Sequence, residues 1–131
     1  MRLCTPLALL ISLAACGGDA PSGGTPDAKP MGDAAVASVV AVTCPASAPT
    51  VTTTSNTDTA VYMPMSTTVS VGGIVKFVMP SMHNVAPNPI KPTDDGLKVD
   101  FGATKCLQFN KAGTFNFFCS NHSFAGSITV Q

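Results

Sequence analysis

The chain has 131 residues, so it can hold at most one domain of ordinary size. Seven basic and seven acidic residues give a formal net charge of zero, which argues against nucleic-acid binding, because such binding needs a basic stripe. Only 11% of the residues are charged, and Val and Thr are frequent, so the composition favours strands over helices.

Residues 1–15 are predicted to be a signal peptide. Arg2 gives a charged start, and the apolar stretch that follows is too short to span a bilayer. The stretch ends in Leu-Ala-Ala followed by Cys16, which resembles the lipobox of bacterial lipoproteins. We therefore expect a lipid on Cys16 and a place in the bacterial cell envelope, at the outer membrane or in the periplasm. An ordinary secretory signal with an incidental Cys16 is the alternative.

Residues 16–35 are predicted to be a lipidated, flexible tether. They are rich in Gly, Pro, Ser and Asp and show no apolar period, so they cannot bury enough surface to offset the entropy cost of ordering. Folded structure is expected over residues 36–131, which is long enough for one small core that a disulfide would help to stabilise.

Residues 36–131 contain many short strand-like runs and no helical window, which predicts an all-β antiparallel sandwich or barrel. A tight turn at Gly72 and Gly73 is expected to join two of the strands. Residues 80–95 carry four prolines and are predicted to be loop. The expected strands are residues 36–43, a weak edge strand within 46–59, and residues 61–63, 67–71, 74–79, 106–109, 114–118 and 127–130.

The chain has two histidines, and both stand where a metal ligand could. His122 lies three residues after Cys119, just past a predicted strand, and His83 follows the strand-like run 74–79. One thiolate and two imidazoles form the His2Cys set that suits a copper electron-transfer site. A lone His is more often a satisfied polar residue and a lone Cys a core hydrophobe, so the joint placement carries the prediction.

The remaining cysteines predict one disulfide. Cys4 leaves with the signal peptide, Cys16 takes the lipid and Cys119 is the candidate ligand, which leaves Cys44 and Cys106. In an oxidising compartment such a pair favours a bridge over two free thiols. The alternative is that either one is simply a small buried hydrophobe.

From about residue 61 onward the sequence resembles the cupredoxin family, in its plastocyanin, pseudoazurin and amicyanin-like branch. The resemblance lies in residues 69–77, the triplet 83–85, residues 109–122 and the final 126–130. It implies a Greek-key β-sandwich and one copper ion per chain, bound by His83, Cys119 and His122. It also implies that the Asn84 side chain ties the two ligand loops together.

One position departs from that family. The weak axial methionine that usually follows the second histidine is missing, and Ala125 stands in its place. We therefore expect three ligands, with at most a weak fourth contact from the Met82 carbonyl, and Phe124 or Ala125 shielding that face from water. Four methionines could form a second, Cu(I)-type site, although gap-filling at strand ends by a flexible side chain is the simpler interpretation; they are Met63, Met65, Met79 and Met82.

The function expected from these residues is electron carriage rather than catalysis. A multicopper oxidase needs further histidines, and no catalytic set or phosphate loop stands out. We expect a monomeric carrier that exchanges electrons with a redox partner protein through His122, with an apolar contact patch of Phe124, Ala125 and Pro87. A copper-handling protein and a metal-free structural module are the alternatives.

Overall fold

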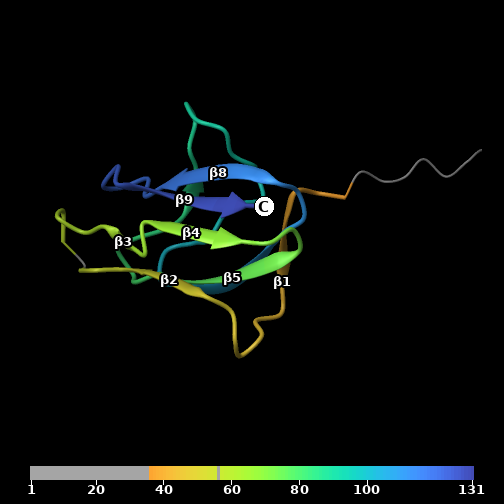
Figure 1. Ribbon diagram of the computed structural model, residues 1–131. Coiled ribbons are helices and arrows are strands. Elements are labelled where there is room, and N and C mark those ends of the chain that lie inside the picture. The colour runs from red at the N-terminus through yellow and green to blue at the C-terminus, as the bar shows by residue number, and fades with distance from the viewer. Residues whose placement is uncertain (1–35, 56) are drawn as a thin grey trace, which may run out of the picture. The chain divides into compact units, whose positions relative to one another are not determined.

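The computed structural model describes residues 36–55 and 57–131, which form two packed β-sheets (Figure 1). The predicted signal peptide, the lipidation at Cys16 and the tether lie outside the described residues. Within the described residues, no helix is long and apolar enough to cross a membrane. The predicted all-β sandwich is confirmed.

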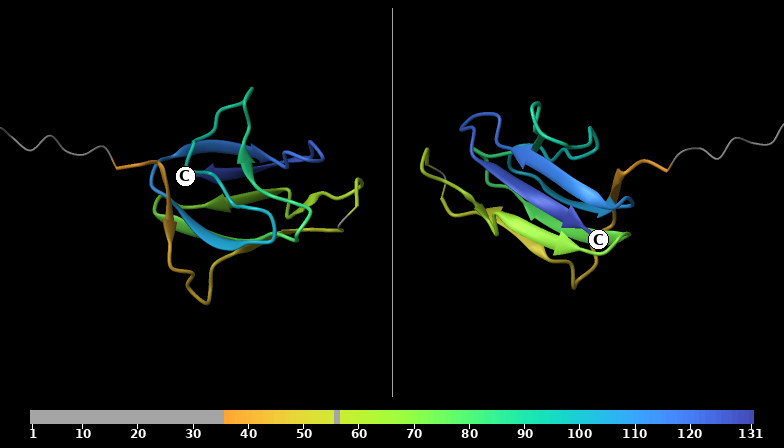
Figure 2. Two further views of the ribbon diagram at one scale, coloured as in Figure 1. Left: turned by 180° about the vertical axis from the view of Figure 1, so that it is seen from behind. Right: turned by 45° about the horizontal axis from the view of Figure 1, so that its top comes forward.

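The sandwich consists of one sheet of five strands and one of four. The first sheet contains, in spatial order, β1 (Val39–Val42), β7 (Thr104–Phe109), β5 (Gly73–Val78), β2 (Thr50–Thr53) and β3 (Tyr62–Met63). The second contains β4 (Ser66–Val69), β9 (Ala125–Val130), β8 (Gly113–Phe118) and β6 (Ala86–Pro87). The views in Figure 2 show the two layers from behind and from above.

The strand pairing is mixed. Most neighbours run antiparallel, but β2 pairs with β5 and β4 pairs with β9 in parallel. These two pairs depart from the predicted antiparallel pattern. Hydrophobic alternation shows which face of a strand is buried, but it does not show which strand lies beside it. The short strand β6 also lies inside the predicted loop 80–95, where it pairs with β8.

The glycine turn forms, but it does not close a hairpin. Gly73 donates its backbone N–H to the Ser70 carbonyl at 2.8 Å, and Gly72 has a φ of 81°, a conformation that glycine adopts without strain. The turn carries the chain from β4 in one sheet to β5 in the other. It therefore joins the two layers of the sandwich.

The core lies between the sheets and reaches the predicted metal site. Alternate residues of β5, β7 and β8 face inward, as a period of two requires. Cys119 belongs to the hydrophobic core cluster, and Phe124 packs against it. The largest fully buried side chains are Tyr62, Phe77, Phe109, Phe117, Leu97, Leu107 and Ile128.

Cys44 and Cys106 form a disulfide with an S–S distance of 2.07 Å and a Cα–Cα distance of 5.1 Å. Cys44 follows β1 and Cys106 lies on β7, so the bridge ties an edge strand to its only hydrogen-bonded neighbour among the described residues. Cys119 is then the one free cysteine in the described part of the chain, and it is buried.

Candidate metal centre

Two loops at one end of the sandwich carry the three candidate ligands. His83 lies in the turn after β5, where its backbone N–H bonds to the Pro80 carbonyl at 3.1 Å. Cys119 directly follows β8, and its loop closes tightly through two backbone bonds, from Cys119 to the Phe124 carbonyl at 2.9 Å and from Ser123 to the Cys119 carbonyl at 2.8 Å. This closure places the His122 ring next to the Cys119 sulfur.

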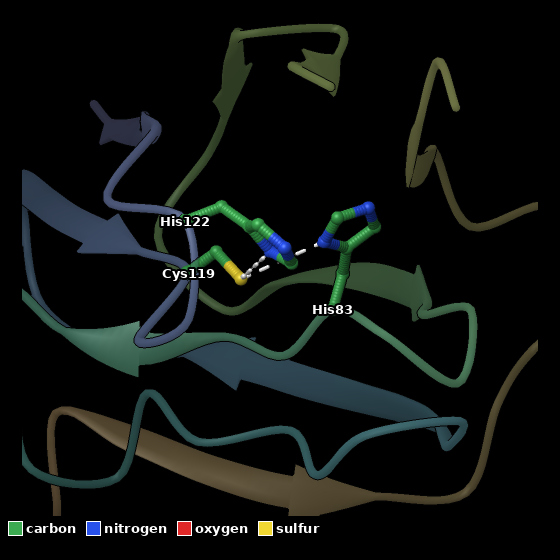
Figure 3. Close-up of side chains that lie close together, drawn as sticks. All are labelled: His83, Cys119 and His122. Carbon is green, nitrogen blue, oxygen red and sulfur yellow. Dashed lines mark hydrogen bonds between the residues drawn. The ribbon is translucent and has the colours of Figure 1, made fainter. Parts of the chain in front are cut away.

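The three donor groups converge (Figure 3). The Cys119 Sγ atom lies 3.7 Å from Nδ1 of His83 and 3.7 Å from Nδ1 of His122, and all three donor atoms lie within 4.8 Å of one another. His83 and Cys119 are fully buried, whereas His122 reaches the surface with 11% of its side chain exposed. The structure thus brings together all three residues that the sequence singled out.

The far nitrogens of both imidazoles have polar neighbours. Nε2 of His83 lies 2.8 Å from the Ser55 carbonyl, and Nε2 of His122 lies 3.2 Å from Oδ1 of Asp58. A carbonyl oxygen can only accept, so Nε2 of His83 carries the proton and Nδ1 keeps its lone pair for the sulfur side. A carboxylate beside His122 favours the same tautomer.

Asn84 connects the two ligand loops, as the family resemblance implied. Its Oδ1 atom accepts hydrogen bonds from the backbone N–H of Ser120 at 2.9 Å and from the Ser120 hydroxyl at 3.1 Å. Because Ser120 follows Cys119 and Asn84 follows His83, these bonds fix the distance between the two buried donors.

An aromatic wall closes the inner side of the site. The Tyr62 hydroxyl donates to the Asn84 carbonyl at 2.5 Å, and the Phe124 ring lies 4.7 Å from Tyr62 and 5.0 Å from His83, centroid to centroid. Burial, and then the charge of Cys119, raise the pKa of Tyr62 well above its usual range. Tyr62 therefore stays a neutral phenol and a constant donor.

Of the two residues expected to shield the axial face, Phe124 packs against both imidazoles. The Phe124 ring stacks on His122 at a centroid distance of 6.4 Å, besides its contact with His83. Ala125 is exposed at the start of β9 and lines a surface pocket with Met65 and Gly126. A contact from the Met82 carbonyl stays a prediction.

The methionines divide into two groups. Met79 is 3% exposed and fills the core, which confirms gap-filling for that residue. Met63, Met65 and Met82 are 56%, 58% and 44% exposed, so for these three gap-filling is wrong. Each sits at a strand end or in a loop, where alternation does not predict burial.

Sequence reasoning missed the loop that contacts the imidazoles from outside. Ser55 and Asp58 lie between β2 and β3, in a Ser- and Thr-rich stretch without apolar period. The only local signal was one carboxylate among hydroxyl side chains. Neither its contact with His122 nor the use of a backbone carbonyl by His83 can be inferred from residue types.

Comparison with solved structures bears on the fold. Amicyanin from Paracoccus versutus superposes with a TM-score of 0.57 at 23% identity, over 72% of this chain and 99% of its own. A purple cupredoxin from Nitrosopumilus maritimus gives a TM-score of 0.50 at 19% identity, over 63% of this chain and 99% of its own. The chain has the cupredoxin fold.

The cupredoxin domain also resembles an amicyanin variant, in its Cu(I) form, in which one methionine is replaced by alanine. That structure has a TM-score of 0.55 at 18% identity and covers 72% of this chain and 99% of its own. No protein-family model and no curated protein matches the sequence. The likeness is thus one of architecture, and the chemistry must be argued from the site itself.

Proposed function

We propose that the protein is an electron carrier with one copper ion bound by His83, Cys119 and His122. The observation that carries this proposal is the convergence of a buried thiol on two imidazole Nδ1 atoms at 3.7 Å. Bonds of about 2.0–2.3 Å to one ion at near-trigonal angles would separate sulfur and nitrogen by about this distance. The donor set therefore fits copper.

The surroundings of the donors support this choice of ion. Burying a thiolate alone is costly, and a cation between the three donors offsets that cost. A structural zinc site is usually closed by four ligands, and the described residues bring together three of the His, Cys, Asp and Glu type. Trigonal His2Cys coordination with a weak or missing axial ligand is typical of copper electron-transfer sites.

Bound copper would supply a one-electron Cu(II)/Cu(I) couple. The protein contributes donors whose positions are held by hydrogen bonds. His83 and Cys119 are held from both sides by Asn84, the Tyr62 hydroxyl and the Ser55 carbonyl. Phe124 keeps water from the inner face, and His122 gives a route to the surface for exchange with a redox partner.

Copper loading of the mature chain tests this function. Addition of Cu(II) should produce a strong thiolate-to-copper charge-transfer band in the visible, which ascorbate bleaches and reoxidation restores. Cys119→Ser should lack the band, while Cys44→Ser with Cys106→Ser should keep it. Failure of the wild-type protein to take up copper would contradict the proposal and favour the alternative of a metal-free structural module.

A copper-handling role is the second candidate, and the exposed methionines favour it. Thioethers are soft ligands for Cu(I), and three of them are partly exposed. Rapid loss of Cu(I) from wild type to an acceptor, slowed in a Met63→Leu, Met65→Leu, Met82→Leu variant, would indicate delivery. Slow loss together with fast, reversible electron exchange would indicate a carrier.

Anchoring to the cell envelope through a lipid on Cys16 completes the proposal. The support is the Leu-Ala-Ala-Cys motif, and the Gly that follows Cys16 favours the outer membrane. More than one acyl chain gives firm attachment where a single chain is marginal. Membrane fractionation tests it: the wild type should sediment with membranes and Cys16→Ser should be released.

A further inference from the structure

The loop between β2 and β3 contacts the metal centre from a side that neither ligand loop covers. Its Ser55 carbonyl meets Nε2 of His83, and its Asp58 carboxylate meets Nε2 of His122. These are the two nitrogens that face away from the sulfur. One segment of the chain thus contacts both imidazoles, although its sequence carries none of the three donor atoms.

Hydrogen bonds within this loop hold it in shape. Thr54 donates its backbone N–H to the Val61 carbonyl at 3.0 Å, and Val61 donates back to the Thr54 hydroxyl at 3.2 Å. Between them the hydroxyl of Thr57 lies 2.9 Å from that of Ser55 and 3.0 Å from that of Thr59. Asp58 therefore projects from a loop that hydrogen bonds brace on both sides of it.

The two imidazoles differ in how replaceable their outer partners are. His83 uses a backbone carbonyl, which no substitution removes. His122 uses a side chain that is 93% exposed, so changing it disturbs no packing. Asp58 can therefore be replaced to isolate the effect of one outer polar contact on one candidate ligand.

We propose that Asp58 is a positioning residue for His122, which fixes the Nε2–H tautomer and strengthens Nδ1 as a donor to copper. This inference rests on the proposed function. A carboxylate beside the far nitrogen of a ligating imidazole fixes the tautomer and the ring orientation. Its negative charge near the ion favours Cu(II) over Cu(I), so Asp58 lowers the reduction potential.

The first test uses metal-free protein and does not depend on copper. NMR of the two imidazoles, at a pH where the rings are neutral, reports which nitrogen carries the proton. His122 should be in the Nε2–H form in wild type and a mixture of tautomers in Asp58→Ala, whereas His83 should be unchanged. An unchanged His122 tautomer in Asp58→Ala would overturn the proposal, whatever the protein does with copper.

The second test uses the copper-loaded full chain. Asp58→Ala should weaken Cu(II) binding about tenfold, the lower end of the usual range because the carboxylate is exposed. With Cu(I) binding unaffected, a tenfold change corresponds to a rise in potential of about 59 mV for one electron. Asp58→Asn should fall between, since it keeps an acceptor without the charge, and Asp58→Glu should restore most of the wild-type value.

Asp95→Asn is the matched control, because Asp95 is another exposed carboxylate, placed in the segment between β6 and β7. It should leave the tautomer, the Cu(II) affinity and the potential as in wild type. Equal shifts in Asp58→Asn and Asp95→Asn would mean a general effect of surface charge and would overturn positioning. Absence of copper uptake by wild type would refute the proposed function and leave the tautomer result to decide the role of Asp58.

Discussion

The two imidazoles of the site are held by different means. His83 is fully buried, and backbone carbonyls bond both its own N–H and its Nε2 atom. His122 stands on a surface loop, and its outer contact is an exposed carboxylate. A ligand held by the backbone is as stable as the fold, whereas a ligand held by a side chain can be altered without touching the fold. The predictions below test this division.

Removing each imidazole in turn should give the largest difference between the ligand held by the backbone and the ligand held by a side chain. His83→Ala should abolish copper binding and destabilise the domain by about 3–5 kcal/mol, as for loss of a buried ring, because it leaves a cavity and an unpaired Ser55 carbonyl. His122→Ala should also abolish the visible band but cost less, about 1–2 kcal/mol, because part of its ring already reaches solvent. Urea unfolding of the metal-free variants measures the difference.

Added imidazole provides a further contrast between the same two variants. The space left by His122 is open to solvent, so free imidazole should restore part of the band in His122→Ala. The space left by His83 is enclosed, so His83→Ala should stay colourless. Recovery in both variants, or comparable losses of stability, would contradict the division between the two histidines.

The disulfide should contribute to the stability of the domain and should not affect copper binding by the two histidines. The bridge joins residues 62 apart, and removing it with Cys44→Ala and Cys106→Ala should cost roughly 2–4 kcal/mol. It joins the segment just after β1 to β7, whereas Cys119 and His122 follow β8. The melting temperature should fall while the band position stays; a shifted band would show that this edge of the sandwich also shapes the site.

Asn84 should affect the buried pair more than the surface ligand. Asn84→Ala removes both bonds to Ser120, which should cost about 1–2 kcal/mol and broaden the geometry between His83 and Cys119. Ser120→Ala removes only the hydroxyl bond and should cost about half as much. Denaturation measures the stability costs, and the width of the copper EPR lines measures the spread in geometry. Equal stability costs for Asn84→Ala and Ser120→Ala would mean that only the hydroxyl bond matters.

The smallest effect should appear only at high pH. The raised pKa of Tyr62 means that the folded protein keeps the phenol proton, while an unfolded tyrosine ionises above about pH 10. The unfolded state then binds fewer protons, so this contribution to stability is complete below about pH 10 and is lost as the pH rises further. Tyr62→Phe should show a flatter decline.

The chain has a single tyrosine, so its ionisation can be followed directly. Tyrosinate absorbance should appear only together with unfolding. Absorbance that rises while the fold is intact would show that the Tyr62 hydroxyl is not held as the donor to the Asn84 carbonyl.

The candidate site could be predicted because its signals are local in sequence. Cys119 and His122 share one short loop, His83 is the only other histidine, and the family resemblance added Asn84 beside it. The strands at 106–109 and 114–118 likewise follow from alternation, since one face of each is buried.

What could not be predicted depends on contacts between distant segments. The turn at Gly72 looked like a hairpin because turn chemistry does not report which sheet the next strand joins. The contact between Asp58 and His122 joins residues far apart in sequence, and an exposed aspartate has no hydrophobic pattern that reveals its partner. Hydrophobic periodicity also does not predict the exposure of residues at or just beyond strand ends, such as Met63 and Met65.

The place of β9 in its sheet sets an order of folding. This last strand lies between β4 and β8, and β4 has no other hydrogen-bonded neighbour among the described strands. A newly made chain therefore holds β4 unpaired until nearly all of the domain has been synthesised, since contacts so distant in sequence form late. The loop that carries Cys119 and His122 lies between β8 and β9, so it closes only when this last strand joins its sheet.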